Sequence, residues 1–150
     1  MQIKTHPPMK VLVATHRTTL ATIHEHIGTV PRELYADAAR QHLLVTGPNY
    51  WFYHGMDGKP ETEFTLEIVI PISGVAENSA AFSYRELPGF KCLSTIHNGS
   101  WSKLGDTYGT LFQHISQNKL RAAGESREVY LNVDFSREEN NLTEVQIGLV

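Results

Sequence analysis

Hydrophobic and polar residues alternate in several short stretches of the chain, which is the pattern of half-buried β-strands. The alternation is clearest in residues 62–72. Four apolar side chains there fall on one face, namely Phe64, Leu66, Ile68 and Ile70. The pattern and the turn residues between apolar runs predict further strands at residues 10–16, 50–54, 81–87, 90–97, 127–132 and 142–150.

A spacing of three to four residues between apolar positions predicts helices in two places. The stronger helix follows the turn Asn98-Gly99-Ser100, which leads into an N-cap, and extends to about Lys119. Its apolar stripe consists of Trp101, Leu104, Tyr108, Leu111, Phe112 and Ile115.

The weaker helical region follows Thr18 and is interrupted at Gly28 to Pro31. Before the interruption, the stripe consists of Leu20, Ile23 and Ile27. After it, Pro31 suits the first turn of a second helical piece. The stripe of this piece consists of Leu34, Tyr35, Ala38 and His42.

The chain repeats one order of elements. Residues 47–53 correspond to residues 124–130 at an offset of 124 − 47 = 77. Residues 10–16 correspond to residues 91–97 at an offset of 91 − 10 = 81. A fixed register over two stretches indicates an internal duplication.

The repeat predicts an α+β fold of one domain, residues 1–150, with copies at about residues 10–72 and 91–150. Each copy reads strand–helix–strand–strand, and the short strand at 81–87 has its counterpart near Met1 to Thr5. Two such units form an antiparallel sheet with helices on one face, and we expect a ligand cleft at the pseudo-two-fold axis.

Composition excludes several classes of protein. The formal net charge is −3 and no block of like charges occurs, which argues against a nucleic-acid surface. No apolar run approaches the roughly 20 residues of a membrane helix, and the N-terminus has no signal-peptide pattern. Cys92 is the single cysteine, so no internal disulfide can form, and a cytoplasmic location is expected.

The strand at residues 127–132 contains an acid whose position is unusual for a core. Alternation places Glu128 and Tyr130 on one face and Val129 and Leu131 on the other. An unpaired buried carboxylate is costly. Glu128 therefore either pairs with a cation of the sheet or lines a pocket that receives one.

The same alternation places Trp51 and Tyr53 with Glu128 and Tyr130 on the face that the helices leave uncovered. The opposite faces, with Phe52, Val129 and Leu131, would pack beneath the helices. Aromatic rings beside an acid suit a flat, apolar, cationic ligand. Ordinary packing of Trp51 and Tyr53 is the alternative.

Three stretches of the second copy resemble the GyrI-like family, which includes effector-binding domains of AraC-type and MerR-type transcription regulators. They are His-Asn-Gly-Ser-Trp-Ser-Lys-Leu-Gly-Asp-Thr-Tyr (97–108), Lys-Leu-Arg-Ala-Ala-Gly (119–124) and Arg-Glu-Val-Tyr-Leu (127–131). The resemblance implies a stand-alone small-molecule-binding protein. In multidrug-sensing relatives, the acid that matches Glu128 neutralises lipophilic cations.

The resemblance leaves two alternatives open. Some stand-alone relatives hydrolyse strained cyclopropyl toxins with an acid and an aromatic hydroxyl, and the candidates here are Glu128, Tyr130 and Tyr108. A protein–protein inhibitor is a weaker alternative, by analogy with relatives named for acting on gyrase. Residues 1–9 are too few for a helix-turn-helix, so we expect no direct DNA binding.

The sequence contains further residues whose side chains could take part in binding or catalysis. Trp101 and Tyr108 lie on the helix stripe and serve either the core or the ligand. No cofactor is expected, since the sequence has no glycine-rich phosphate loop. No metal is expected either, because His24 and His26 are two residues apart and point to different sides of a helix. The triad residue types His97, Ser100 and Asp106 occur, but no nucleophile elbow surrounds the serine.

Overall fold

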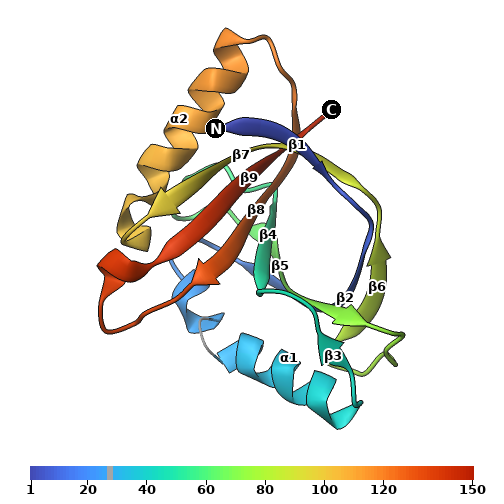
Figure 1. Ribbon diagram of the computed structural model, residues 1–150. Helices are drawn as coiled ribbons and strands as arrows, with labels where there is room; N and C mark the ends of the chain where they lie inside the picture. The colour runs from blue at the N-terminus through green and yellow to red at the C-terminus, as the bar shows by residue number, and fades with distance from the viewer. Residues whose placement is uncertain (27–28) are drawn as a thin grey trace. The chain divides into compact units, whose positions relative to one another are not determined.

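The computed structural model describes residues 1–26 and 29–150. These residues form two compact units. Unit 1 comprises Met1–His6 and Phe90–Val150, and unit 2 comprises Pro7–Gly89. Each unit has an antiparallel sheet and one α-helix among its described residues, as Figure 1 shows, so the predicted α+β class is confirmed. The predictions that involve Ile27 and Gly28 lie outside the described residues.

In unit 1 the strands lie in the order β1, β7, β9, β8. Their bounds are β1 (Gln2–His6), β7 (Phe90–Asn98), β8 (Ala122–Asn132) and β9 (Leu142–Leu149). The helical elements are η2 (Trp101–Lys103), α2 (Leu104–Gln117) and η3 (Glu138–Asn140). Ser100 caps the first of these, since its side chain accepts a hydrogen bond from the backbone N–H of Ser102. The predicted turn and cap are therefore confirmed.

In unit 2 the strands lie in the order β4, β5, β2, β6, and the short β3 also pairs with β5. Their bounds are β2 (Met9–Thr18), β3 (Leu44–Val45), β4 (Tyr50–His54), β5 (Phe64–Ser73) and β6 (Ser83–Leu87). The helical elements are η1 (Ile23–His26) and α1 (Thr29–Arg40). No helix in the described part of the chain is long and apolar enough to cross a bilayer.

The two copies exchange their first strands. β1, which begins the first copy, belongs to unit 1 with the second copy, and β6, which begins the second copy, belongs to unit 2 with the first. β1 pairs with β7, and β6 pairs with β2. The two pairings have the same register: Ile3 lies opposite Leu93, and Tyr84 lies opposite Leu12, with 84 − 3 = 81 and 93 − 12 = 81. The sequence predicted that these strands correspond but gave no sign of the exchange.

Helix α2 covers one face of the unit 1 sheet, on β7 and β9 (Figure 1). Leu111 and Ile115 are its buried residues. They form one core cluster with Leu93, Val145 and Ile147. The predicted stripe is correct except at Phe112, whose side chain is 48% exposed.

Two predictions about the first helical region are wrong. The segment around Ile23 forms a short 3₁₀ turn instead of an α-helix. In α1, Leu34 and Ala38 are buried as predicted, but Tyr35 is 39% exposed. His42 lies beyond the end of α1 with a positive φ of 55°. Pro31 does lie in the first turn of α1.

The predicted assignment of sheet faces is also wrong. Glu128 lies opposite Val145, and paired residues share a face, so Glu128 points toward α2. Phe52 packs with strand residues in a cluster that contains no described α1 residue, and Leu131 is 48% exposed. Alternation shows which side chains share a face, but it does not show which face a helix covers.

Candidate ligand-binding site

Glu128 lies in the middle of β8 and is only 4% exposed. Both of its carboxylate oxygens accept hydrogen bonds from tyrosines of unit 1. The Tyr108 hydroxyl donates to Oε1 at 2.8 Å, and the Tyr130 hydroxyl donates to Oε2 at 2.5 Å. The structure therefore brings together three of the predicted site residues.

The two tyrosines reach Glu128 for different local reasons. Tyr130 follows Glu128 by two residues on β8 and so lies on the same face of the strand. Tyr108 projects from α2, whose apolar residues hold the helix against that face. Hydrogen bonds to an ionised acceptor are shorter and stronger than neutral ones, so the two phenols offset part of the cost of burying the carboxylate.

Trp101 packs against the cluster formed by Glu128, Tyr108 and Tyr130, through its contact with Tyr130. Its ring meets Tyr130 edge-on, with ring centroids 5.5 Å apart and planes at 72°. Its indole Nε1 donates to Thr143 Oγ1 at 3.0 Å, and Thr143 is fully buried. Thr143 lies opposite Tyr130 on β9, so one strand pair holds both rings. Sequence reasoning missed Thr143, because a buried threonine on a strand carries no distinctive pattern.

The two remaining predicted ligand residues belong to unit 2. Trp51 and Tyr53 lie on β4 and are 5% and 4% exposed. The Tyr53 ring lies 5.8 Å from that of Phe64. Their role toward a ligand stays a prediction.

Sequence reasoning also missed two buried acids, each of which meets a cation on an exchanged strand. Glu144 on β9 is bonded to Lys4 on β1, and Glu67 on β5 is bonded to Arg85 on β6. The acids are related by 144 − 67 = 77 and the cations by 85 − 4 = 81, the two repeat offsets. The sequence therefore did contain a sign of these ion pairs, because an acid recurs at the offset of 77 and a cation recurs at the offset of 81.

The environment of Glu144 changes its acidity. Burial raises its pKa, but hydrogen bonds from Lys4, Gln146 and Ser94, together with the charge of Lys4, outweigh burial. The pKa of Glu144 is therefore below its ordinary value. The carboxylate is held in its charged form and fastens β1 to β9 across β7.

Three other residues with chemically reactive side chains, His97, Ser100 and Cys92, lie in surroundings that fit a structural role. His97 is hydrogen-bonded through Nδ1 to Thr107 Oγ1 at 2.7 Å and through Nε2 to the Ser100 carbonyl at 2.8 Å. The Ser100 hydroxyl bonds to Ser102 and Glu138. Burial raises the pKa of the Cys92 thiol to about 11, so the thiol is protonated at neutral pH.

The chain belongs to a family described as the GyrI-like small molecule binding domain, whose model matches residues 1–150. The resemblance seen in the sequence is thereby confirmed. A search of curated proteins gave no match.

Solved structures share the fold at low sequence identity. The C-terminal domain of EcmrR matches with a TM-score of 0.83 and 20% identity, over 99% of this chain and 96% of that one. A hydrolase encoded by lin2189 of Listeria innocua matches with a TM-score of 0.73 and 15% identity, over 99% and 91%. SAV2435 bound to tetraphenylphosphonium matches with a TM-score of 0.61 and 14% identity, over 99% and 93%.

EcmrR in a complex with DNA matches with a TM-score of 0.84 and 20% identity. The chain covers 56% of the length of that EcmrR chain. At these identities the structures establish the fold, and the family model adds that the fold is a small-molecule-binding domain.

Proposed function

We propose that this protein binds flat hydrophobic small molecules, cations in preference, with Glu128 as the countercharge. The observation that carries the proposal is a carboxylate that is 4% exposed and has a tyrosine hydroxyl on each oxygen. One of these tyrosines, Tyr130, packs edge-on against the half-buried Trp101. Aromatic faces attract cations, and a desolvated carboxylate supplies the opposite charge.

The comparisons support this ligand class without establishing it. One structure of the same fold, SAV2435, is bound to tetraphenylphosphonium, which is a lipophilic cation. EcmrR is a DNA-bound protein, and its C-terminal domain has the fold of this chain.

We expect no direct DNA binding by this chain, because the formal net charge is −3. A reducing cytoplasm suits the buried, unpaired Cys92.

A matched pair of probes tests the role of the charge. N-methylacridinium is a flat cation, and acridine has nearly the same shape and is uncharged at pH 8. We expect the wild-type protein to bind the cation with a dissociation constant in the micromolar range, or about 8 kcal/mol of binding free energy. Fluorescence titration measures both affinities.

The Glu128→Gln variant separates charge from shape. Leaving a buried cation without its partner costs about 2–5 kcal/mol, so N-methylacridinium should bind roughly 30-fold or more weakly. The affinity for acridine should change much less. An equal loss for both probes would show that Glu128 is not a countercharge.

A hydrolase is the second candidate, and one observation favours it. Tyr108 and Tyr130 place two phenolic O–H groups on one carboxylate, which is a set of groups that could activate water or protonate a leaving group. In this role Glu128 would be the acid or base, and a tyrosine hydroxyl would assist. One protein with the same fold is a hydrolase from Listeria innocua.

Turnover distinguishes the two candidates. A binder captures a strained cyclopropyl electrophile stoichiometrically and forms no product. A hydrolase forms product over many cycles, and Glu128→Gln lowers its rate by about 10²–10⁴. We propose the binder, because binding alone accounts for the buried acid and the aromatic rings. Multiple turnovers in the wild type that disappear in Glu128→Gln would establish the hydrolase instead.

A further inference from the structure

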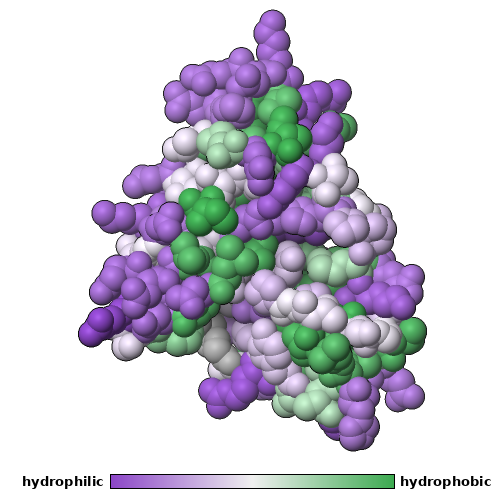
Figure 2. Space-filling view, in the orientation of Figure 1, coloured by the Kyte–Doolittle hydropathy of each residue, from purple (hydrophilic) through white to green (hydrophobic). Residues whose placement is uncertain are grey.

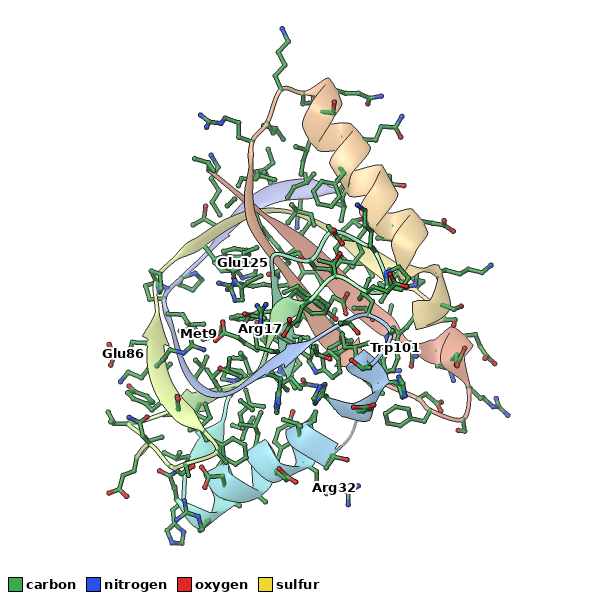
Figure 3. All side chains as sticks on the ribbon, turned by 180° about the vertical axis from the view of Figure 1, so that it is seen from behind. Met9, Arg17, Arg32, Glu86, Trp101 and Glu125 are labelled. Atoms are coloured by element: carbon green, nitrogen blue, oxygen red, sulfur yellow. The ribbon has the colours of Figure 1, made fainter. Side chains whose placement is uncertain are left out.

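The connection between β8 and β9 holds a phenylalanine at the surface. Phe135 is 71% exposed, and its ring lies edge-on to Trp101, with centroids 6.0 Å apart and planes at 80°. Figure 3 shows Trp101 at the end of α2 that faces this connection. Hydrophobic side chains reach the surface over the end of β8 in Figure 2, where Leu131 and Val133 are also exposed.

Asp134 fixes the conformation of this connection. Its Oδ1 accepts hydrogen bonds from the backbone N–H and hydroxyl of Ser136 and from the backbone N–H of Arg137, at 2.8–3.0 Å. Its Oδ2 accepts one from Asn140 Nδ2 at 3.0 Å. These bonds lower the pKa of Asp134 to about 2, and the bond from Asn140 contributes most to the shift. Phe135 thus follows a residue that is anchored on both carboxylate oxygens.

The connection is also fastened to the start of the helical segment that carries Trp101. The Ser100 hydroxyl donates to Glu138 Oε2 at 2.7 Å, and the backbone N–H of Gly99 donates to the Asn141 carbonyl at 2.9 Å. Hydrogen bonds therefore hold both the connection that carries Phe135 and the start of the segment that carries Trp101.

The corresponding connection in unit 2 shows that the loop does not need an aromatic residue. Asp57 matches Asp134, since 134 − 57 = 77. It anchors its own loop in the same way, accepting from the backbone N–H of Lys59 and from the Thr62 hydroxyl, both at 2.9 Å. The next residue there is Gly58, where the second copy has Phe135. An exposed ring at this position contributes little to the core, so packing of the core does not account for its contact with Trp101.

We infer that Phe135 is the outer aromatic contact of the ligand site and packs, together with Trp101, against a planar aromatic ligand. The rings form a continuous series from Phe135 to Trp101 to Tyr130, whose hydroxyl bonds to Glu128. Along this series the exposure falls from 71% at Phe135 to 4% at Glu128. The inference rests on the proposed function and adds a residue to the site.

Variants at Phe135 and at one control position test the inference with the same two probes. Removing one aromatic contact in Phe135→Ala should weaken N-methylacridinium and acridine alike, by roughly threefold to tenfold, because the ring contributes a contact and no charge. Phe135→Tyr keeps the ring and should stay within about twofold of the wild type. Phe112→Ala removes another exposed phenylalanine of unit 1 and should leave both affinities unchanged.

Two outcomes would overturn the inference, and they are distinguishable. Wild-type affinities for both probes in Phe135→Ala would show that Phe135 is not a ligand contact, while the proposed function would stand. Failure of the wild-type protein to bind either probe would overturn the proposed function and the inference with it.

Discussion

At the scale of single residues, Glu128 shows how a carboxylate is accommodated in a core. A buried acid is costly unless its oxygens receive hydrogen bonds. Here one tyrosine donor comes from the same strand and another from a helix, so two separate elements contribute hydrogen bonds to its oxygens. The acid therefore links the position of α2 to that of β8.

This arrangement predicts a loss of stability when one donor is removed. Tyr108→Phe keeps the ring but leaves Glu128 Oε1 without the Tyr108 hydroxyl. We expect the free energy of unfolding, measured with urea at pH 7, to fall by about 1–3 kcal/mol. Tyr35→Phe, at a 39% exposed tyrosine on α1, is the control and should change it by less than about 0.5 kcal/mol. Equal effects of the two substitutions would contradict this account of Glu128.

At the scale of elements, the exchanged strands are held by pairs of opposite charge. β1 pairs with one strand, β7, in unit 1, and its Lys4 reaches over to Glu144 on the next strand, β9. β6 has the same relation to β2 and β5 through Arg85 and Glu67. Each pair thus ties three strands together.

The lowered pKa of Glu144 predicts how acid affects the molecule. The folded-state pKa is below the ordinary value of 4.5, so the stability that this carboxylate contributes is present above that value. It is lost as the pH falls from 4.5 through the folded-state pKa. In urea titrations, Glu144→Gln should remove part of the stability at pH 7 and flatten the decline below about pH 4.5.

Glu61→Gln, at an exposed carboxylate of unit 2, is the control and should leave the acid decline as in the wild type. If Glu144→Gln declined with acid as steeply as the wild type, the Lys4–Glu144 pair would not hold the strand as described.

At the scale of the whole molecule, the two units share an order of elements and a strand register, which supports the duplication predicted from the sequence. Arg127 lies opposite Gln146, and Tyr50 lies opposite Val69, with both residues shifted by 77. Superposition of residues 10–72 on 91–150 stays a prediction. The copies differ at Glu128, where the first copy has Trp51, so we assign the charged part of the site to one copy.

The sequence was sufficient for those parts of the fold that depend on local pattern. The strand at residues 50–54 follows from a run of aromatic residues bounded by turn residues. The helix after Ser100 follows from helical spacing and a cap. The face covered by α2 could not be derived, because both faces of β8 contain apolar and charged side chains. The strand exchange was equally hidden, because β1 and β6 can pair with either copy of a repeated partner.

The candidate site was predictable in its residues but not in its connections. Glu128 and the aromatic residues Tyr108, Tyr130 and Trp101 could be named as candidates from the strand and helix patterns. The hydrogen bonds from Tyr108 and Tyr130 depend on the helix packing on the same face as the acid, which only the structure shows. Phe135 lies in a loop, where no periodic pattern marks a ring that contacts Trp101.

A crystal structure of the complex with a brominated N-methylacridinium tests the central claim most directly, because the bromine can be located by its anomalous scattering. We predict one bound cation in contact with the Glu128 carboxylate and within about 6 Å of the Trp101 ring centroid. A fully occupied cation elsewhere on the protein, with the Tyr108 and Tyr130 hydrogen bonds to Glu128 unchanged and no ligand beside them, would contradict the account.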